Sequence, residues 1–386
     1  MEKKYAIYGA GRWGTKAIEE YGKENVSYVI DSNIQLQGTK LNGIEVVDFQ
    51  HFLGDEEKPQ VIVAVKNFLD IRKQLIENEV HDYILYIPRH ASYFPQDVLV
   101  YNTYEHRGEV FSEADYNEAN CENELQFLRI ENRVEHLKKS VPLFDYIGIE
   151  TYNRCNGVCE FCPVSVQAES REECLMDKAL FQKIIDGLAE LNYSGRISLF
   201  CNNEPFLDSR ILEFHKYARE MLPNARMHLY TNGTLLTLDK FIELMEYLDE
   251  LIIDNYNQEL KLIPNARKIK EYCEQHPKLI ERVTIVLRKP QEILATRGGD
   301  APNRQEKISY ENTKCVNPFI QMIVRPDGKI SLCCNDPLGR DTLGDLNCSS
   351  LTEVWYGEKF NKVREALAKG RQYWPHCKYC DVFNPD

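Results

Sequence analysis

Three cysteines stand close together directly after a strand-like apolar run, and their spacing constrains this chain more than any other feature. They follow the pattern C-x3-C-x2-C and are Cys155, Cys159 and Cys162. Three thiolates on one short loop can bind three irons of a [4Fe-4S] cube and leave the fourth iron open to a small molecule. A structural zinc site is the alternative, although zinc sites usually pair two C-x2-C units or add histidines, and this loop has no histidine.

This spacing, with the aromatic Phe161 just before the third cysteine, resembles the signature of the radical S-adenosylmethionine (radical SAM) superfamily. The resemblance implies that the open iron binds the amino and carboxylate groups of SAM. It also implies that an electron, delivered by a flavodoxin- or ferredoxin-type donor, cleaves SAM. The resulting 5′-deoxyadenosyl radical would abstract hydrogen from an unactivated C–H bond.

A second segment similar to this family follows the next strand-like run. Relatives usually have Gly-Gly-Glu or Gly-Glu-Pro there, whereas this chain keeps only Glu204 and Pro205 and has Asn202 and Asn203 at the glycine positions. By resemblance, backbone groups at Asn203 and the Glu204 carboxylate would hold the SAM ammonium. Asparagine reaches some backbone geometries less readily than glycine, so the pocket differs in detail from that of relatives. Taken alone, the segment is a turn.

The third segment contains Thr231 and Asn232, followed by a glycine. It is similar to the Thr-Asn-Gly that ends the fourth strand in many relatives, and its polar side chains would reach the ribose or carboxylate of SAM. Taken alone, it is a junction between a strand and a turn.

Strand-like runs alternate with helix-periodic segments through the middle of the chain, such as the helix expected over 177–192. Repeated strand-helix units predict an α/β fold with a parallel sheet. The resemblance implies a partial (β/α)6 barrel. All three motifs follow strand-like runs, and the carboxyl ends of parallel strands carry the chemistry in such folds. The runs lie near 144–150, 196–201, 226–231, 249–254 and 281–287.

A second cysteine set lies near the carboxyl terminus and comprises Cys315, Cys333, Cys377 and Cys380. Between the first two, the pattern predicts a β-hairpin that turns at 326–328, and a helical stretch around 351–369 precedes the last two. The spacing resembles the auxiliary-cluster domain called SPASM, or twitch in its shorter form, and implies one auxiliary [4Fe-4S] cluster. Cys334 or Cys348 could replace Cys333, and a four-cysteine zinc site is the alternative.

The amino-terminal segment carries a different motif. Gly9, Gly11 and Gly14 form a G-x-G-x-x-G turn between a strand-like run and a helix, and Asp31 ends the next run at the offset where an acid binds a ribose diol. Such glycines let a pyrophosphate approach the backbone at the helix amino terminus. The segment resembles nucleotide-binding heads found beside sugar-modifying transferases of surface-polysaccharide pathways. This implies a bound nucleotide or nucleotide-sugar, with a degenerate scaffold as the alternative.

The chain is thus expected to contain a small Rossmann-like domain over 1–112, a helical connector over 113–140, a partial barrel over 141–305 and an auxiliary-cluster domain over 306–386. The 47 basic and 60 acidic residues give a net charge of −13, which argues against nucleic-acid or anionic-membrane partners. No apolar run approaches the length of a membrane span, and no signal-peptide core follows Met1. The cysteines are expected to be reduced thiols in a cytoplasm.

The predicted reaction is oxidation or epimerisation of a carbohydrate or nucleotide-sugar carbinol, because relatives with one auxiliary cluster include alcohol dehydrogenases of aminoglycoside sugars. Arg297, between the last barrel strand and Cys315, is a candidate for orienting or deprotonating the hydroxyl, with a surface arginine as the alternative. Three other functions stay open. They are a radical SAM enzyme that modifies peptides, a nicotinamide-dependent oxidoreductase with electron-relay clusters, and a non-catalytic iron-sulfur subunit.

Overall fold

The computed structural model describes residues 4–88, 94–95, 97–105, 113–304 and 308–383 of the chain. The chain forms two compact units. Unit 1 comprises Met1–Ala91, Phe111–Ser140 and Phe383–Asp386, and unit 2 comprises Ser92–Val110 and Val141–Val382. None of the described helices is long and apolar enough to cross a membrane.

Unit 1 contains a six-stranded sheet with the order β3-β4-β2-β1-β5-β6. β1 pairs in parallel with both β2 and β5, so the strand order changes direction at β1, where the glycine turn begins. The elements are β1 (Tyr5–Tyr8), α1 (Arg12–Tyr21), β2 (Val26–Ile30), β3 (Lys40–Leu41), β4 (Ile44–Val47), α2 (Phe49–Gly54), β5 (Gln60–Val63), α3 (Leu69–Glu77), β6 (Tyr83–Leu85) and α4 (Glu113–Leu137).

The long helix α4 packs on unit 1. Asn132 on α4 accepts a hydrogen bond from the Leu85 N–H and donates one to the Tyr83 carbonyl, at 2.8 and 2.9 Å, and Leu125 is buried in the apolar core of this unit. The segment expected as a connector therefore belongs to unit 1.

Unit 2 is built on a nine-stranded sheet with the order β15-β14-β13-β8-β9-β10-β11-β12-β7. The strands from β13 to β7 pair in parallel, whereas β14 and β15 are antiparallel. This confirms a mixed α/β fold with a parallel sheet. The strands are β7 (Val100–Asn102), β8 (Tyr146–Ile149), β9 (Arg196–Ser198), β10 (Arg226–Thr231), β11 (Glu250–Tyr256), β12 (Val283–Arg288), β13 (Gln321–Val324), β14 (Lys329–Ser331) and β15 (Thr342–Asp345).

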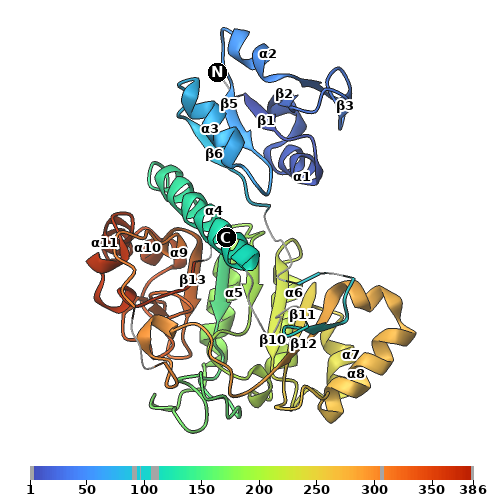
Figure 1. Ribbon diagram of the computed structural model, residues 1–386. Helices are drawn as coiled ribbons and strands as arrows, with labels where there is room; N and C mark the ends of the chain where they lie inside the picture. The colour runs from blue at the N-terminus through green and yellow to red at the C-terminus, as the bar shows by residue number, and fades with distance from the viewer. Residues whose placement is uncertain (1–3, 89–93, 96, 106–112, 305–307, 384–386) are drawn as a thin grey trace. The chain divides into compact units, whose positions relative to one another are not determined.

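Helices cover the sheet in chain order, with α5 against α6, α6 against α7 and α7 against α8 (Figure 1). α5 begins at Asp177, whose carboxylate accepts a hydrogen bond from the Ala179 N–H at 2.7 Å and so satisfies an otherwise free amide. The helices are α5 (Lys178–Glu190), α6 (Ile211–Met221), α7 (Leu238–Leu244), α8 (Pro264–Gln275), α9 (Asn317–Ile320), α10 (Leu351–Trp355) and α11 (Glu358–Leu367).

Two boundaries differ from those expected. β7 lies before residue 112, yet it is the edge strand beside β12, so the amino-terminal unit does not extend continuously to 112. At the other side, β13 pairs in parallel with β8, so the carboxyl-terminal hairpin continues the central sheet. Residues 141–382 therefore form one compact unit, with no division near 305.

Candidate active site

The cysteine loop begins directly after β8, at the carboxyl end of a central strand. Its backbone is fixed at several points: the Glu160 N–H donates to the Pro290 carbonyl at 2.9 Å, and the Val166 N–H donates to the Gly157 carbonyl at 3.0 Å. The Cys162 N–H also donates to the Cys159 carbonyl at 3.1 Å. The loop is therefore held at both its centre and its end.

Two of the three thiols of this loop lie beside the same glycine. A Cβ atom added to Gly157 would lie 3.2 Å from the Cys155 sulfur and 3.8 Å from the Cys159 sulfur, so both sulfurs flank the glycine. The Gly157 N–H donates to the Cys155 sulfur at 3.3 Å, a contact that stabilises a thiolate. Burial raises the pKa of Cys155 to about 11, and this N–H opposes the rise.

Glu204 lies beside this loop and is buried. Its carboxylate accepts hydrogen bonds from the Thr231 hydroxyl and the Asn232 N–H, both at 2.8 Å, and from the Phe206 N–H at 3.2 Å. Burial raises the pKa of Glu204, while these donors oppose the rise. Three residues singled out from two separate sequence segments are therefore in direct contact.

Further contacts join this pocket to the cysteine loop. The Glu204 N–H donates to the Arg154 carbonyl at 2.9 Å, and the Asn232 side chain donates to the Asn156 side chain at 2.8 Å. Thr231 ends β10, which is the third strand of the sheet when counted from β8.

Asn203 and Phe161 are both buried near the loop. The Asn203 side-chain carbonyl accepts a hydrogen bond from the Cys201 N–H at 3.1 Å, but its side-chain nitrogen has no partner among the described residues. A buried donor without a partner is costly, so this nitrogen is suited to a bound polar ligand. The Phe161 ring packs on Tyr256 with 5.9 Å between ring centres.

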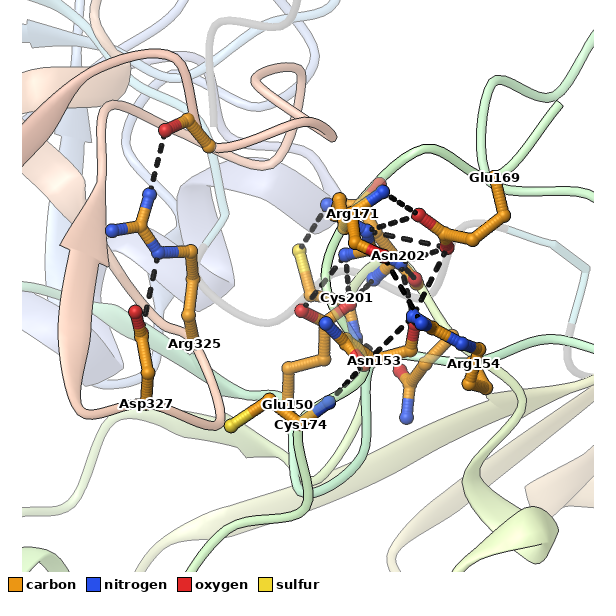
Figure 2. Close-up of polar contacts among 12 residues, drawn as sticks. Glu150, Asn153, Arg154, Glu169, Arg171, Cys174, Cys201, Asn202, Arg325 and Asp327 are labelled. Carbon is orange, nitrogen blue, oxygen red and sulfur yellow. Dashed lines mark hydrogen bonds and ion pairs between the residues drawn. The ribbon is translucent and has the colours of Figure 1, made fainter.

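A buried network not expected from the sequence connects the loop to the end of β9 (Figure 2). The Arg171 guanidinium donates to Glu150 at 3.2 Å, to Glu169 at 2.8 Å and to the carbonyls of Asn153 and Asn202 at 2.9 and 3.0 Å. Burial raises the pKa of Glu150 to about 7, although Arg171 opposes this rise. Arg171 lies in an irregular segment whose sequence has no periodicity. The one sequence signal for this network was Glu150, an acidic residue at the end of a strand.

The carboxyl-terminal cysteines also gather. Cys333, Cys377 and Cys380 line one small cavity together with Asn335 and His376, and burial raises the pKa of Cys333. The Asn335 N–H donates to the Cys333 sulfur at 3.3 Å. Cys348 instead is exposed and its thiol donates to the Asp345 carbonyl at 3.5 Å.

Arg297 lies on a 3₁₀ turn (Arg297–Gly299) in which three consecutive residues have positive φ, namely Arg297 at 52°, Gly298 at 66° and Gly299 at 96°. Non-glycine residues in this region are strained and often functional. The Arg297 guanidinium donates a hydrogen bond to the Asn202 side-chain carbonyl. Its Nε is buried and has no partner among the described residues.

These residues fit iron-sulfur clusters. In the described parts of the chain no three His, Cys, Asp or Glu side chains converge as they would around a single metal ion. A cube is bound at separate corners, so its thiolates stand further apart than the ligands of one ion. The N–H donors to the Cys155 and Cys333 sulfurs are of the kind that stabilises cluster thiolates.

The amino-terminal glycines meet at the carboxyl end of β1. Gly9 has φ of 118°, and a Cβ atom on Gly14 would lie 1.9 Å from the Gly9 carbonyl oxygen, so the helix approaches the strand this closely only because Gly14 has no side chain. Gly11 faces open space. The Asp31 carboxylate accepts a hydrogen bond from the Ala10 N–H at 2.7 Å, which brings the predicted acid to the glycine turn.

Comparison with known proteins identifies two domains. The model of the radical SAM superfamily matches residues 149–289, and that of SPASM, an iron-sulfur cluster-binding domain, matches residues 315–381. The S-adenosyl-L-methionine-dependent 2-deoxy-scyllo-inosamine dehydrogenase of Niallia circulans is 28% identical over 240 residues, which cover 62% of this chain and 93% of that protein.

Solved structures agree. The crystal structure of BtrN in complex with AdoMet and 2-DOIA is similar to this chain with a TM-score of 0.55 and 26% identity, over 64% of this chain and 97% of BtrN. The chain therefore carries a radical SAM domain followed by a SPASM domain, and it is a radical SAM oxidoreductase that uses SAM with one [4Fe-4S] cluster and an auxiliary cluster.

Proposed function

We propose that this enzyme oxidises a secondary carbinol of a carbohydrate or nucleotide sugar to the ketone. The observation that carries the proposal is the hydrogen bond from Arg297 to the Asn202 side-chain carbonyl. The side-chain nitrogen of Asn202 also donates to the Cys334 carbonyl at 3.4 Å. A basic side chain thus lies between the segment that precedes Glu204 and the one that carries Cys333. The dehydrogenase of Niallia circulans supports oxidation of a cyclic alcohol as the reaction. Epimerisation of the same carbon is the second candidate.

In this proposal each cysteine set binds one cluster. Cys155, Cys159 and Cys162 hold the SAM-binding cluster, and the carboxyl-terminal set, Cys315, Cys333, Cys377 and Cys380, holds the auxiliary one. The SAM pocket consists of Phe161, Asn203, Glu204, Thr231 and Asn232. The contacts of Glu204 with Thr231 and Asn232 support it, as does the unpartnered side-chain nitrogen of Asn203.

Conversion of a carbinol to a ketone removes one hydrogen atom, one proton and one electron. When bound, SAM and its cluster would supply the 5′-deoxyadenosyl radical, which takes the hydrogen atom. The auxiliary cluster would accept the electron. The chain itself has to manage the hydroxyl proton. A guanidinium that donates a hydrogen bond to a hydroxyl lowers its pKa, because the cation stabilises the oxyanion. We assign stabilisation of this oxyanion to Arg297, whose Nε–H has no partner among the described residues, and the released proton passes to water.

The finer features of the fold follow the same proposal. Strands β8 to β12 with β7 form a partial (β/α)6 barrel whose carboxyl ends carry the reaction. Unit 1 is a Rossmann-like domain that binds a nucleotide or nucleotide-sugar at Gly9, Gly11, Gly14 and Asp31. The strand order around β1 and the contact of Asp31 with the glycine turn support it. A flavodoxin- or ferredoxin-type protein in the cytoplasm would deliver the electron.

The test uses anaerobically reconstituted protein with dithionite and SAM. We expect about eight irons per chain, as two cubes require, and formation of 5′-deoxyadenosine that is lost when Cys155, Cys159 and Cys162 are changed to Ala. With a panel of cyclitols and nucleotide sugars that includes 2-deoxy-scyllo-inosamine, the oxidised substrate should lose two mass units.

Deuterium at the reacting carbon should appear in 5′-deoxyadenosine. Absence of 5′-deoxyadenosine, or its persistence in the triple variant, would contradict the proposal. A product of unchanged mass that has exchanged hydrogen with the solvent would favour epimerisation.

A further inference from the structure

Every polar group of Asn202 is engaged, and Figure 2 shows where this residue lies relative to Glu150 and Arg171. Its backbone N–H donates to Glu150 at 2.9 Å, and its backbone carbonyl accepts from Arg171 at 3.0 Å. Its side-chain carbonyl accepts from Arg297, and its side-chain nitrogen donates to the Cys201 sulfur at 3.2 Å and to the Cys334 carbonyl at 3.4 Å. The backbone contacts would exist with glycine, whereas the side-chain contacts are specific to asparagine.

The partner of this side chain is itself held firmly. Thr296, just before Arg297, donates from its backbone to the Asp381 carboxylate at 2.7 Å and from its hydroxyl to the Tyr379 carbonyl at 2.7 Å. A Cβ atom on Gly298 would lie 2.9 Å from the Asn335 carbonyl, so this glycine packs directly on the segment after Cys333. The turn that carries Arg297 is therefore fixed both to the segment after Cys333 and to the segment around Cys380.

From these contacts we propose that Asn202 is the positioning residue of the carbinol oxidation. Its side-chain carbonyl fixes the Arg297 guanidinium, and its side-chain nitrogen fixes this pair against Cys201 and the Cys334 carbonyl. The inference rests on the proposed function, because it gives Arg297 the task of stabilising the substrate oxygen as its proton leaves. A guanidinium that can rotate would satisfy this task poorly, since transition-state donors act through fixed orientation.

The structure offers a clean substitution. Asn202→Gly removes the side chain and keeps the backbone contacts with Glu150 and Arg171, so the end of β9 should stay folded. Asn202→Ala serves as a second variant, and Asn202→Asp keeps an acceptor for Arg297. Asn361→Ala is the matched control, because Asn361 likewise accepts a side-chain hydrogen bond from an arginine, Arg364, at 3.0 Å.

The first measurement is reactivity of Arg297 in the reconstituted protein towards phenylglyoxal, followed by peptide mass spectrometry. We expect Arg297 to react about tenfold faster in the Gly and Ala variants than in the wild type, and the Asp variant to restore protection. The Asn361→Ala variant should leave Arg297 unchanged. Equal reactivity of Arg297 in the wild type and in Asn202→Gly would overturn the inference.

The second measurement is the ratio of ketone to 5′-deoxyadenosine, with the panel compound that the wild type oxidises fastest. A merely structural role would lower both products together. We expect 5′-deoxyadenosine formation to persist in Asn202→Gly while the ratio falls about tenfold, with partial rescue in Asn202→Asp. An unchanged ratio would sink the inference. If the wild type forms no ketone from any compound, the proposed function fails, and the reactivity of Arg297 still decides whether Asn202 holds it.

Discussion

At the scale of single residues, the site is defined by charges that are buried in pairs. Glu150 is 2% exposed and lies against Arg171, which also binds Glu169 and two backbone carbonyls. Removing a charge from water is costly, and the cost is offset only when the partners and their hydrogen bonds are all present. The network therefore fixes the start of the cysteine loop to the end of β9 with little freedom.

Loss of Arg171 alone should lower the stability of unit 2 more than loss of both Arg171 and the Glu150 charge. We expect Arg171→Met to destabilise unit 2 by about 3–5 kcal/mol, because Glu150 would remain buried without its cation. The double variant Arg171→Met with Glu150→Gln should recover a large part of this loss. Chemical denaturation of the reconstituted proteins measures both effects. A single variant as stable as the wild type would show that water or a rearranged side chain replaces the guanidinium.

At the scale of elements, the glycine turn between β1 and α1 sets how closely the helix approaches the strand. A Cβ atom on Gly14 would lie 1.9 Å from the Gly9 carbonyl oxygen, whereas a Cβ atom on Gly11 would meet nothing within 4 Å. Overpacking of this kind usually costs about 1–3 kcal/mol. We therefore expect Gly14→Ala to lower the thermal midpoint of unit 1 by several degrees, and Gly11→Ala to leave it unchanged. Equal midpoints for the two variants would contradict the packing argument.

The longer elements were predictable from the sequence because their patterns are strong. The five central strand runs correspond to β8 to β12, and the helix expected over 177–192 is α5, whose buried face includes Ile184 and Leu188. β7 was not predicted, because three residues, Val-Tyr-Asn, carry no periodicity, and only pairing with β12 makes them a strand.

The candidate site, too, was predictable only where its residues carry a local sequence signal. Glu204, Thr231 and Asn232 were singled out because short motifs at strand ends carry local signals, and they are in contact. Arg171 was missed, because an ion pair with Glu150 depends on how the chain returns after the cysteine loop. The side chain of Asn202 was noted only as a missing glycine, and its contact with Arg297 joins residues 95 positions apart.

At the scale of the whole molecule, the two units have separate apolar cores. The core of unit 2 lies around β8 to β13. Unit 1 has two clusters of buried apolar residues, one on each face of its sheet, and neither shares a residue with the core of unit 2. Separate cores unfold as separate cooperative units. We expect two calorimetric transitions, of which only one moves when the clusters are removed.

Cluster removal should lower the transition of unit 2 by several degrees, because groups that bind only the folded state stabilise it. The Gly14→Ala variant identifies the other transition, since its effect is confined to unit 1. The control is reconstituted wild type measured under the same anaerobic conditions. A single transition that shifts as a whole on cluster removal would show that the two units unfold together.

The position of β7 has a consequence for how this chain can be shortened. The strand precedes α4 in the chain and yet forms the edge of the sheet beside β12, so the polypeptide leaves unit 1, contributes a strand to unit 2 and returns. A shortened protein that starts at residue 113 would lack this strand and leave the backbone of β12 unpaired along one side. Unpaired edges recruit strands from other molecules. Unit 1 is thus built from chain segments on both sides of β7, so a single cut cannot separate it from unit 2.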